Sequence, residues 1–199
     1  NNNTRIALIG NPNAGKSSLF NALTGLRQKT GNYAGVTVDR HEGSVSIEDG
    51  AIRRRMQVID LPGLYSLYPK SEDERIACST LLDVKENIGV AVLVLDSTNL
   101  RRSLLLATQV IDLKFPTVVV LNMIDEADRQ GIKIDIKGLS QTLGVHVVTV
   151  DSRRHTGLEE LKRAINIASV SESHFYDVSQ NFEEGYRGHV RRVLEAEEN

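Results

Sequence analysis

The stretch Gly10-Asn11-Pro12-Asn13-Ala14-Gly15-Lys16-Ser17 matches in full the phosphate-binding loop pattern G-x-x-x-x-G-K-[ST]. The apolar run 5–9 before it predicts a buried strand, and residues 16–24 after it predict a helix. This context makes a chance match by a glycine-rich turn a poor alternative. The glycines allow a tight turn whose N–H groups point at phosphate oxygens. The residues expected to contact a nucleotide here are Asn11, Asn13, Ala14, Gly15, Lys16, Ser17 and Ser18.

Two further positions predict a magnesium ion beside the phosphates. Lys16 is expected to lie along the terminal phosphates, and the Ser17 hydroxyl is expected to ligate Mg²⁺. Asp60-Leu61-Pro62-Gly63 follows a strand-like run, so Asp60 is expected to hold Mg²⁺ through water and the Gly63 N–H to approach the terminal phosphate. Alone, D-x-x-G is a weak pattern that an ordinary turn also explains. Together with the phosphate-binding loop it indicates a functional pair.

The stretch Asn122-Met123-Ile124-Asp125 predicts that the base is guanine. A carboxylate that accepts two N–H bonds from guanine discriminates against adenine, because a buried unpaired partner is costly. The usual pattern is Asn-Lys-x-Asp, and Met123 replaces the lysine with an apolar contact. An Asn/Asp helix cap is the structural alternative. Asp151-Ser152-Arg153 stands where GTPases carry Ser-Ala-Lys, and a backbone N–H of Ser152 could contact the guanine oxygen.

Two positions bear on hydrolysis. Thr37, in Gly35-Val36-Thr37-Val38, is placed to complete the Mg²⁺ shell when triphosphate is bound, as in the order–disorder switch of GTPases. Leu64 follows Gly63, where many GTPases carry a glutamine that positions water. Leucine can neither orient nor deprotonate water, so we expect hydrolysis to be slow or to be helped by another element.

The order of apolar runs predicts an α/β fold with three layers, and together with the motifs above it resembles the Ras-like P-loop GTPase fold. We expect a mostly parallel six-stranded sheet with one antiparallel strand, because buried strands alternate with helices. Residues 38–47 and 51–59, around Asp49-Gly50, predict an antiparallel hairpin. Residues 25–37 are expected to form a loop. The other expected strands are 90–95, 117–121 and 145–150, and the other expected helices are 74–84, 100–113, 135–143 and 158–167.

Composition and the end of the chain set further limits. A net charge of −2 gives no argument for binding to nucleic acid or to an anionic membrane surface. Cys78, the single cysteine of the sequence, is expected to be a buried apolar residue and allows no internal disulfide. The apolar runs 89–95 and 117–121 are too short to span a bilayer. We expect a G domain over residues 1–168, then over 169–199 a linker and an amphipathic helix that begins a helical appendage.

Four stretches together resemble the N-terminal cytosolic G domain of FeoB-type ferrous iron transporters. They are the phosphate-binding loop 10–17, the segment 31–38 (Gly-Asn-Tyr-Ala-Gly-Val-Thr-Val), the segment 60–67 (Asp-Leu-Pro-Gly-Leu-Tyr-Ser-Leu) and 122–125 (Asn-Met-Ile-Asp). The second and third are the specific ones. Ala34 departs from the family, which often has proline there, so a more flexible switch loop is expected.

The resemblance implies GTP hydrolysis, slow and stimulated by K⁺, that drives or regulates Fe²⁺ uptake through the transporter's own membrane domain. Asn13 matches the residue that ligates K⁺ in related GTPases, so the residues implied in catalysis are Asn13, Lys16, Thr37 and Gly63. GTP or GDP, Mg²⁺ and K⁺ are the implied ligands, with no nucleic-acid partner. The resemblance also implies a place on the cytoplasmic side of the bacterial inner membrane and allows a homo-oligomer through the membrane part.

Two alternatives remain open from the residues. An Era-like GTPase that acts on RNA or ribosomes shares the Gly-x-Pro-Asn-x-Gly-Lys-Ser loop, although such proteins usually carry a basic RNA-binding domain and no strongly basic segment is present. A nucleotide-sensing switch with negligible turnover is compatible with Leu64 and Met123. Hydrolysis of GTP in K⁺ and in Na⁺ separates these possibilities.

Overall fold

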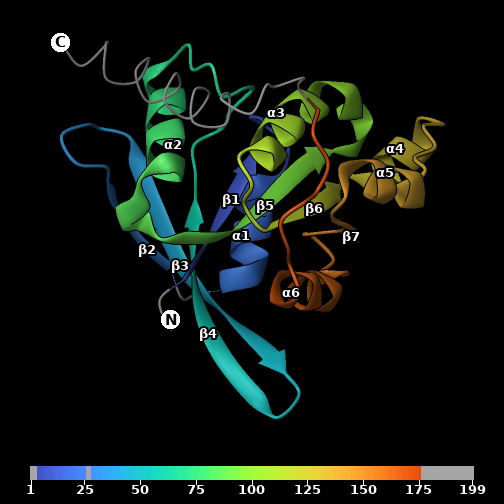
Figure 1. Ribbon diagram of the computed structural model, residues 1–199, viewed down its shortest axis with the longest axis horizontal. Helices are drawn as coiled ribbons and strands as arrows, with labels where there is room; N and C mark the ends of the chain where they lie inside the picture. Colours follow the sequence, from blue (N-terminus) through green and yellow to red (C-terminus); the bar gives the residue numbers. More distant parts are fainter. Residues whose placement is uncertain (1–3, 26–27, 176–199) are drawn as a thin grey trace.

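The computed structural model describes residues 4–25 and 28–175. Within these residues the chain forms one seven-stranded sheet in the order β2-β3-β4-β1-β5-β6-β7 (Figure 1). The strands are β1 (Arg5–Gly10), β2 (Gln28–Asn32), β3 (Asp39–Asp49), β4 (Ile52–Asp60), β5 (Ile88–Asp96), β6 (Thr117–Asn122) and β7 (His146–Val150).

Most neighbouring strands of this sheet are parallel. β1 pairs in parallel with β4 and β5, and β6 pairs in parallel with β5 and β7. β3 is antiparallel to both of its neighbours, β2 and β4. The predicted mostly parallel α/β fold with one antiparallel strand is therefore confirmed. The expected hairpin around Asp49-Gly50 is the β3–β4 hairpin, whose turn points downward in the view of Figure 1.

Helices cover both faces of the sheet and give the three layers. One hydrophobic cluster lies between the sheet and α2, α3 and α5, and a second lies between the sheet and α1 and α6. β6 is buried at every position, as expected for a parallel strand covered on both sides. The helices are α1 (Lys16–Thr24), α2 (Glu72–Leu82), α3 (Leu100–Asp112), α4 (Ile124–Arg129), α5 (Ile136–Leu143) and α6 (Leu158–Asn166), with 3₁₀ turns η1 (Val84–Glu86) and η2 (Ser97–Asn99).

One prediction of the chain path needs correction. Residues 28–32, expected within a loop, form β2, so the described sheet has seven strands rather than six. β2 is a polar edge strand whose last four residues are exposed, and it is held by backbone pairing to β3. An edge strand of this kind needs no apolar alternation, which is why its sequence shows no strand pattern. The sequence pattern also did not predict the short helix α4.

The described residues after α6 lie against the domain. Thr117 N donates to Ser169 O at 3.2 Å, and Ser171, which is buried, donates its hydroxyl to Leu143 O at 2.7 Å. Lys114 Nζ donates to the carbonyls of Ser171 and Ser173 at 3.2 and 3.0 Å. The first part of the expected linker is thus held in place. The amphipathic segment expected at 182–194 lies outside the described residues.

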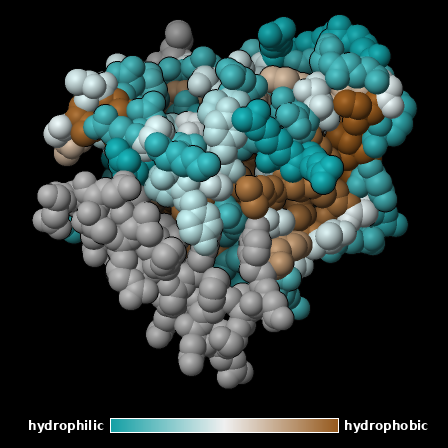
Figure 2. All heavy atoms as spheres, turned by 90° about the horizontal axis from the view of Figure 1, so that it is seen from above, coloured by the Kyte–Doolittle hydropathy of each residue, from teal (hydrophilic) through white to brown (hydrophobic). Residues whose placement is uncertain are grey.

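Most of the residues coloured in Figure 2 are hydrophilic, with a hydrophobic patch on the right of the view and a smaller one on the left. In the ranges 4–25 and 28–175 no helix is both long enough and apolar enough to cross a membrane. Cys78 is fully buried on α2, as expected, and burial raises the pKa of its thiol to about 12. It therefore behaves as a small apolar core residue.

Candidate functional site

The loop between β1 and α1 leaves the N-terminus of α1 open. Gly15 caps α1 with a φ of 85°, and as a glycine it has no side chain to accept from the first turn of the helix. A Cβ at Gly15 would lie 1.9 Å from the Asn122 amide nitrogen, so both the conformation and the space require glycine. Asn13 has a φ of 66°, which asparagine tolerates better than most residues. The free N–H groups at the start of α1 form a site for an anion.

Three polar groups meet beside this loop. Lys16 Nζ forms a salt bridge with Asp60 Oδ1, and Ser17 Oγ lies 3.4 Å from Asp60 Oδ2. The side chains of Lys16 and Asp60 are only 10% and 7% exposed, so the ion pair is largely desolvated. Because Asp60 ends β4, the sheet itself holds the carboxylate next to α1.

The Ser17 hydroxyl and the Asp60 carboxylate suit Mg²⁺, which prefers oxygen ligands. Among the described residues, no group of three or more His, Cys, Asp or Glu side chains could hold a metal ion. A magnesium ion here would therefore take its remaining ligands from water and from the phosphates of a nucleotide, which is its usual mode of binding.

The segment after Asp60 is fastened to the phosphate-binding loop. Leu61 N donates to Leu8 O at 3.2 Å, and Leu64 N donates to Gly10 O at 2.9 Å. A Cβ at Gly63 would lie 2.8 Å from Pro12 Cγ, so glycine allows the two loops to touch. The Leu64 side chain has no exposed area and belongs to the cluster that α2 and α3 cover. Residue 64 therefore points away from the site.

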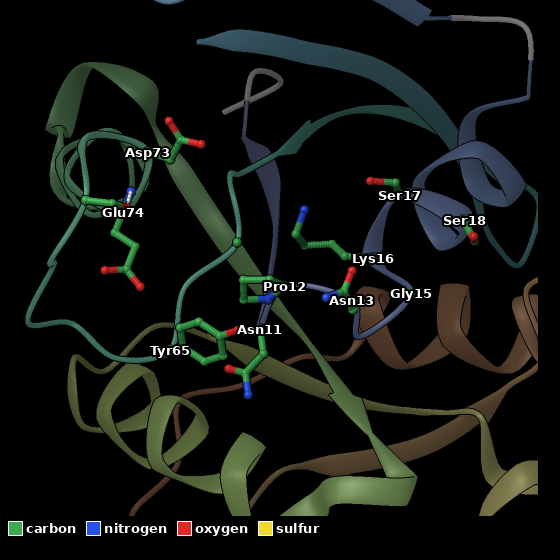
Figure 3. Close-up of a pocket in the computed structure, with 12 residues that line it drawn as sticks. Asn11, Pro12, Asn13, Gly15, Lys16, Ser17, Ser18, Tyr65, Asp73 and Glu74 are labelled. Atoms are coloured by element: carbon green, nitrogen blue, oxygen red, sulfur yellow. Dashed lines mark hydrogen bonds between the residues drawn. The ribbon is translucent and has the colours of Figure 1, made fainter.

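A cavity of about 490 Å³ opens between the phosphate-binding loop and the start of α2 (Figure 3). Figure 3 shows Tyr65 beside Pro12 and Asn11, with Asp73 and Glu74 coming from α2 on the opposite side from Ser17. The lining residues are Asn11, Pro12, Asn13, Gly15, Lys16, Ser17, Ser18, Gly63, Tyr65, Ser71, Asp73 and Glu74. The buried Asn11 Oδ1 has no hydrogen-bond partner in the described structure, so this wall retains a free acceptor.

Helix α3 holds the wall that carries Tyr65. The Arg102 guanidinium lies 4.2 Å from the centre of the Tyr65 ring, and Leu67 N donates to the buried Gln109 Oε1 at 2.8 Å. Sequence reasoning missed Tyr65, Ser71, Asp73 and Glu74 as lining residues. Ser71 and the acids at 72–74 were identifiable only as a helix start, and Ser71 does accept from Glu74 N at 3.2 Å. Only the tertiary structure shows that α2 begins at the cavity.

The Asn122–Asp125 stretch joins the site at the end of β6. Asn122 Nδ2 donates to Ala14 O at 3.1 Å, which ties the strand end to the phosphate-binding loop. Met123 is the N-cap of α4 with a φ of 59°, and its Cε lies 3.5 Å from where a Gly15 Cβ would be. Asp125 is exposed in the first turn of α4, where its carboxylate accepts from Arg129 at 3.4 Å. The Asp125 carboxylate is thus accessible to a base.

The Asp151-Ser152-Arg153 stretch lies next to it. Val150 pairs with Asn122, so residues 151–153 follow directly beside the end of β6. Ser152 is buried, and its Oγ has no partner in the described part of the chain. Arg153 is exposed.

The switch loop, residues 33–38, contributes no residue to the lining of the cavity. Tyr33 N donates to Val38 O at 3.0 Å, so residues 33–38 form the tip between β2 and β3. Thr37 at this tip is exposed. Tyr33 is buried, which raises the pKa of its phenol to about 12, and Arg40 lies 5.2 Å from its ring. The tip is thus anchored by one aromatic side chain while Thr37 stays exposed.

The structure therefore gathers part of the predicted site. Asn11, Asn13, Gly15, Lys16, Ser17, Ser18 and Gly63 line the cavity. Asp60 contacts Lys16, and Asn122 contacts Ala14. The lining of this cavity does not include Gly35, Val36, Thr37, Asp125, Asp151, Ser152 or Arg153.

Comparison with known proteins gives a consistent picture. The family model described as ferrous iron transport protein B matches residues 4–165. An Fe(2+) transporter FeoB from Leptospira biflexa is 45% identical over 161 residues, which are 81% of this chain and 23% of that protein. The chain thus spans less than a quarter of the length of this relative.

Solved structures of similar chains have the same fold. The cytosolic domain of L. pneumophila FeoB superposes with a TM-score of 0.81 at 33% identity, over 97% of this chain and 88% of that one. A point mutant of S. thermophilus NFeoB bound to GDP gives 0.76 at 38% identity, over 96% and 72%. The cytosolic domain of the T. maritima FeoB iron transporter in its GMPPNP form gives 0.77 at 39% identity, over 88% and 68%.

Proposed function

The chain belongs to the family of the ferrous iron transport protein B, and we propose that it binds GTP and hydrolyses it to GDP and phosphate. The observation that carries this proposal is the meeting of Lys16, Ser17 and Asp60 at the open N-terminus of α1. A cation, a hydroxyl and a carboxylate beside free N–H groups can bind a phosphate chain and its metal ion. Relatives described as bound to GDP and in a GMPPNP form support the choice of nucleotide.

Each group has a role in this proposal. Lys16 exchanges its salt bridge with Asp60 for the terminal phosphates, and the N–H groups of Gly15 and Ser18 hold phosphate oxygens. Ala14, whose N–H donates to Asn11 O at 3.2 Å, lies beside the phosphates as part of the loop. Ser17 and Asp60 hold Mg²⁺, with Thr37 joining when the switch loop closes. Bound Mg²⁺ neutralises charge that develops on the phosphates. The Gly63 N–H approaches the terminal phosphate.

Guanine is bound by the second group of residues. Asp125 accepts two N–H bonds from the base, Asn122 positions the loop, and Met123 gives an apolar contact to the ring. The Ser152 N–H donates to the guanine oxygen. Gly35, Val36, Asp151 and Arg153 are the remaining residues proposed to lie at the bound nucleotide.

Hydrolysis is slow and K⁺-stimulated in this proposal. The side chain of Leu64 does not reach the water that attacks the terminal phosphate, because it is buried in the core. Asn13 is exposed in the wall of the cavity, where its side-chain oxygen can ligate K⁺ next to the phosphates. A potassium ion there supplies positive charge of the kind that an arginine finger supplies elsewhere.

The role of the whole protein is proposed from its relatives. We propose that this domain drives or regulates Fe²⁺ uptake through a membrane domain of the same protein, on the cytoplasmic side of the bacterial inner membrane. GTP and that membrane domain are its partners, nucleic acid is not, and a homo-oligomer would form through the membrane part.

Single-turnover GTP hydrolysis in K⁺ and in Na⁺ tests the proposal. We expect faster hydrolysis in K⁺, and we expect Asn13→Ala to remove this stimulation while GDP binding stays nearly unchanged. Asn166→Ala is the matched control, because Asn166 lies on α6 and contacts Arg54 away from the cavity. Tight binding with negligible turnover in both salts would instead support a nucleotide-sensing switch. Unchanged K⁺ dependence in Asn13→Ala would contradict the role of Asn13.

A further inference from the structure

The segment that carries Tyr65 is fixed at two points, one on each side of that residue. On one side, Leu64 N donates to Gly10 O at 2.9 Å. On the other side, Leu67 N donates at 2.8 Å to Gln109 Oε1, which belongs to a buried side chain of α3. Both bonds hold backbone, so neither of them decides where the Tyr65 ring lies.

A charged side chain of α3 holds the ring itself. The Arg102 guanidinium lies 4.2 Å from the centre of the Tyr65 ring, inside the range of about 6 Å over which a cation and a ring attract each other. Gln109 stands about two turns further along the same helix, so its contact with the segment comes from the same face of α3. This face of α3 therefore holds both the backbone and the ring of the segment.

The ring stands beside the part of the site at which hydrolysis is proposed to take place. Figure 3 shows Tyr65 beside Pro12 and Asn11, and all three residues line the cavity. A Cβ at Gly63 would lie 2.8 Å from Pro12 Cγ, so the next neighbour of Pro12 is Gly63. A row of neighbours thus runs from α3 through Tyr65 and Pro12 to Gly63, whose N–H is proposed to approach the terminal phosphate.

We propose that Arg102 is a positioning residue for GTP hydrolysis, which acts by holding the Tyr65 ring beside the phosphate-binding loop. This inference rests on the proposed function, because it assumes that the terminal phosphate lies at the Gly63 N–H. A small displacement of a positioning group slows a reaction that depends on the alignment of the reacting atoms. The buried Leu64 side chain supplies no group that orients water, so the alignment depends on the wall that Tyr65 forms.

The test measures single-turnover GTP hydrolysis in K⁺ by the 199-residue chain. We expect Arg102→Ala to hydrolyse GTP about three- to fivefold more slowly, which is the loss expected for one exposed cation–π contact. Its affinity for GDP and its half-saturating K⁺ concentration should stay within about twofold of wild type, because the phosphate-binding loop is unchanged.

Arg101→Ala is the matched control. It removes the same charge from the next position of α3, and Arg101 is also exposed. Arg101 lines a different cavity, together with Ile134 and Leu139. Hydrolysis by this variant should stay within about 1.5-fold of the wild-type rate, because Tyr65 keeps its contact.

A double-mutant cycle distinguishes an action through the ring from a general loss of structure. Tyr65→Leu removes the ring and should slow hydrolysis to a similar extent. Adding Arg102→Ala to Tyr65→Leu should then have no further effect, since the contact is already lost. Arg102→Lys keeps a cation for the ring and should recover part of the rate. An equal fold loss from Arg102→Ala in both backgrounds would overturn the inference.

A fluorescence measurement reports the contact in the absence of nucleotide. The chain contains no tryptophan, so Tyr65→Trp introduces a single indole, the ring that attracts a cation most strongly. In this background Arg102→Ala should increase the quenching of the indole by acrylamide, and Arg101→Ala should not. Unchanged quenching, or a wild-type rate of hydrolysis by Arg102→Ala, would overturn this inference alone. Failure of the wild-type chain to hydrolyse GTP would overturn the proposed function, and the role of Arg102 with it.

Discussion

Leu64 follows Gly63 at the edge of the cavity, and its side chain lies wholly inside the hydrophobic core. Its backbone N–H is also used, since it donates to Gly10 O at 2.9 Å. The burial of Leu64 therefore explains why no side chain at position 64 can position water in this site. The position serves packing, and the chemistry must come from other groups.

Replacing Leu64 by glutamine tests this view. Leu64→Gln should not accelerate GTP hydrolysis, and it should lower the free energy of unfolding by about 2–4 kcal/mol, because it buries an amide in the core. Urea unfolding and single-turnover hydrolysis measure the two effects. Tyr65→Gln is the neighbouring control. Tyr65 is 38% exposed, so the free energy of unfolding should change by about 1 kcal/mol or less. A stable Leu64→Gln variant with faster hydrolysis would show that residue 64 can reach the site.

At the scale of elements, a set of charges joins the turn η1 to two strands. Glu86 of η1 accepts from Arg40 of β3 at 2.8 Å and also pairs with Arg5 of β1. The hydrogen bond from Arg40 is the main reason that the pKa of Glu86 lies below its ordinary value of 4.5, with a further contribution from Arg5. Arg40 also lies over Tyr33, so this network reaches the base of the switch loop.

The direction of the Glu86 shift sets a pH dependence. A carboxyl whose pKa is lower in the folded protein adds stability above its ordinary pKa of 4.5 and loses it as the pH falls through the folded value. We expect Glu86→Gln to cost about 1–3 kcal/mol at pH 7 and to flatten the stability profile below about pH 5. Urea unfolding from about pH 3 to pH 7 measures both. Glu48→Gln, in an exposed pair with Arg53, should change stability by about 0.5 kcal/mol or less. Parallel profiles for wild type and Glu86→Gln would contradict the assignment.

At the scale of the whole molecule, the residues after α6 close one side of the domain. Ser171 is buried and donates to Leu143 O, and Phe175, whose ring packs against the core, has its N–H 3.3 Å from Asp112 Oδ1. Pro116 and Val170 form an isolated bridge beside β6. Residues 169–175 thus pack against the sheet and its helices, and the boundary at 168 stays a prediction.

Shortened chains test where the domain ends. A chain of residues 1–168 should be about 2–4 kcal/mol less stable than a chain of residues 1–175, because it loses these hydrogen bonds and the buried area of Phe175. Urea unfolding of the two chains measures the difference, and both should still bind GDP. Equal unfolding midpoints would place the end of the domain at 168.

Much of this protein was readable along the chain because its signals are local. The phosphate-binding loop between a buried strand and a helix, the Asp-Gly hairpin and the continuous apolar runs of β5 and β6 each depend on neighbours in sequence. β2 was not predicted, because an exposed polar edge strand has no apolar pattern of its own and forms by pairing with its partner strand, β3. Tyr65 and Glu74 were not predicted as lining residues, because the wall of a cavity is made by segments that are distant in sequence and meet only in the folded chain.

The sequence alone determined the fold class, the phosphate-binding loop and the order of the site motifs, because backbone propensities and burial patterns act over a few residues. Only the tertiary structure decided which groups touch. It paired Lys16 with Asp60, sent Leu64 into the core and left Thr37 exposed at the tip of the β2–β3 loop. It also placed the Arg102 guanidinium over the Tyr65 ring. Such contacts depend on side-chain direction and on the packing of distant strands, which no local pattern contains.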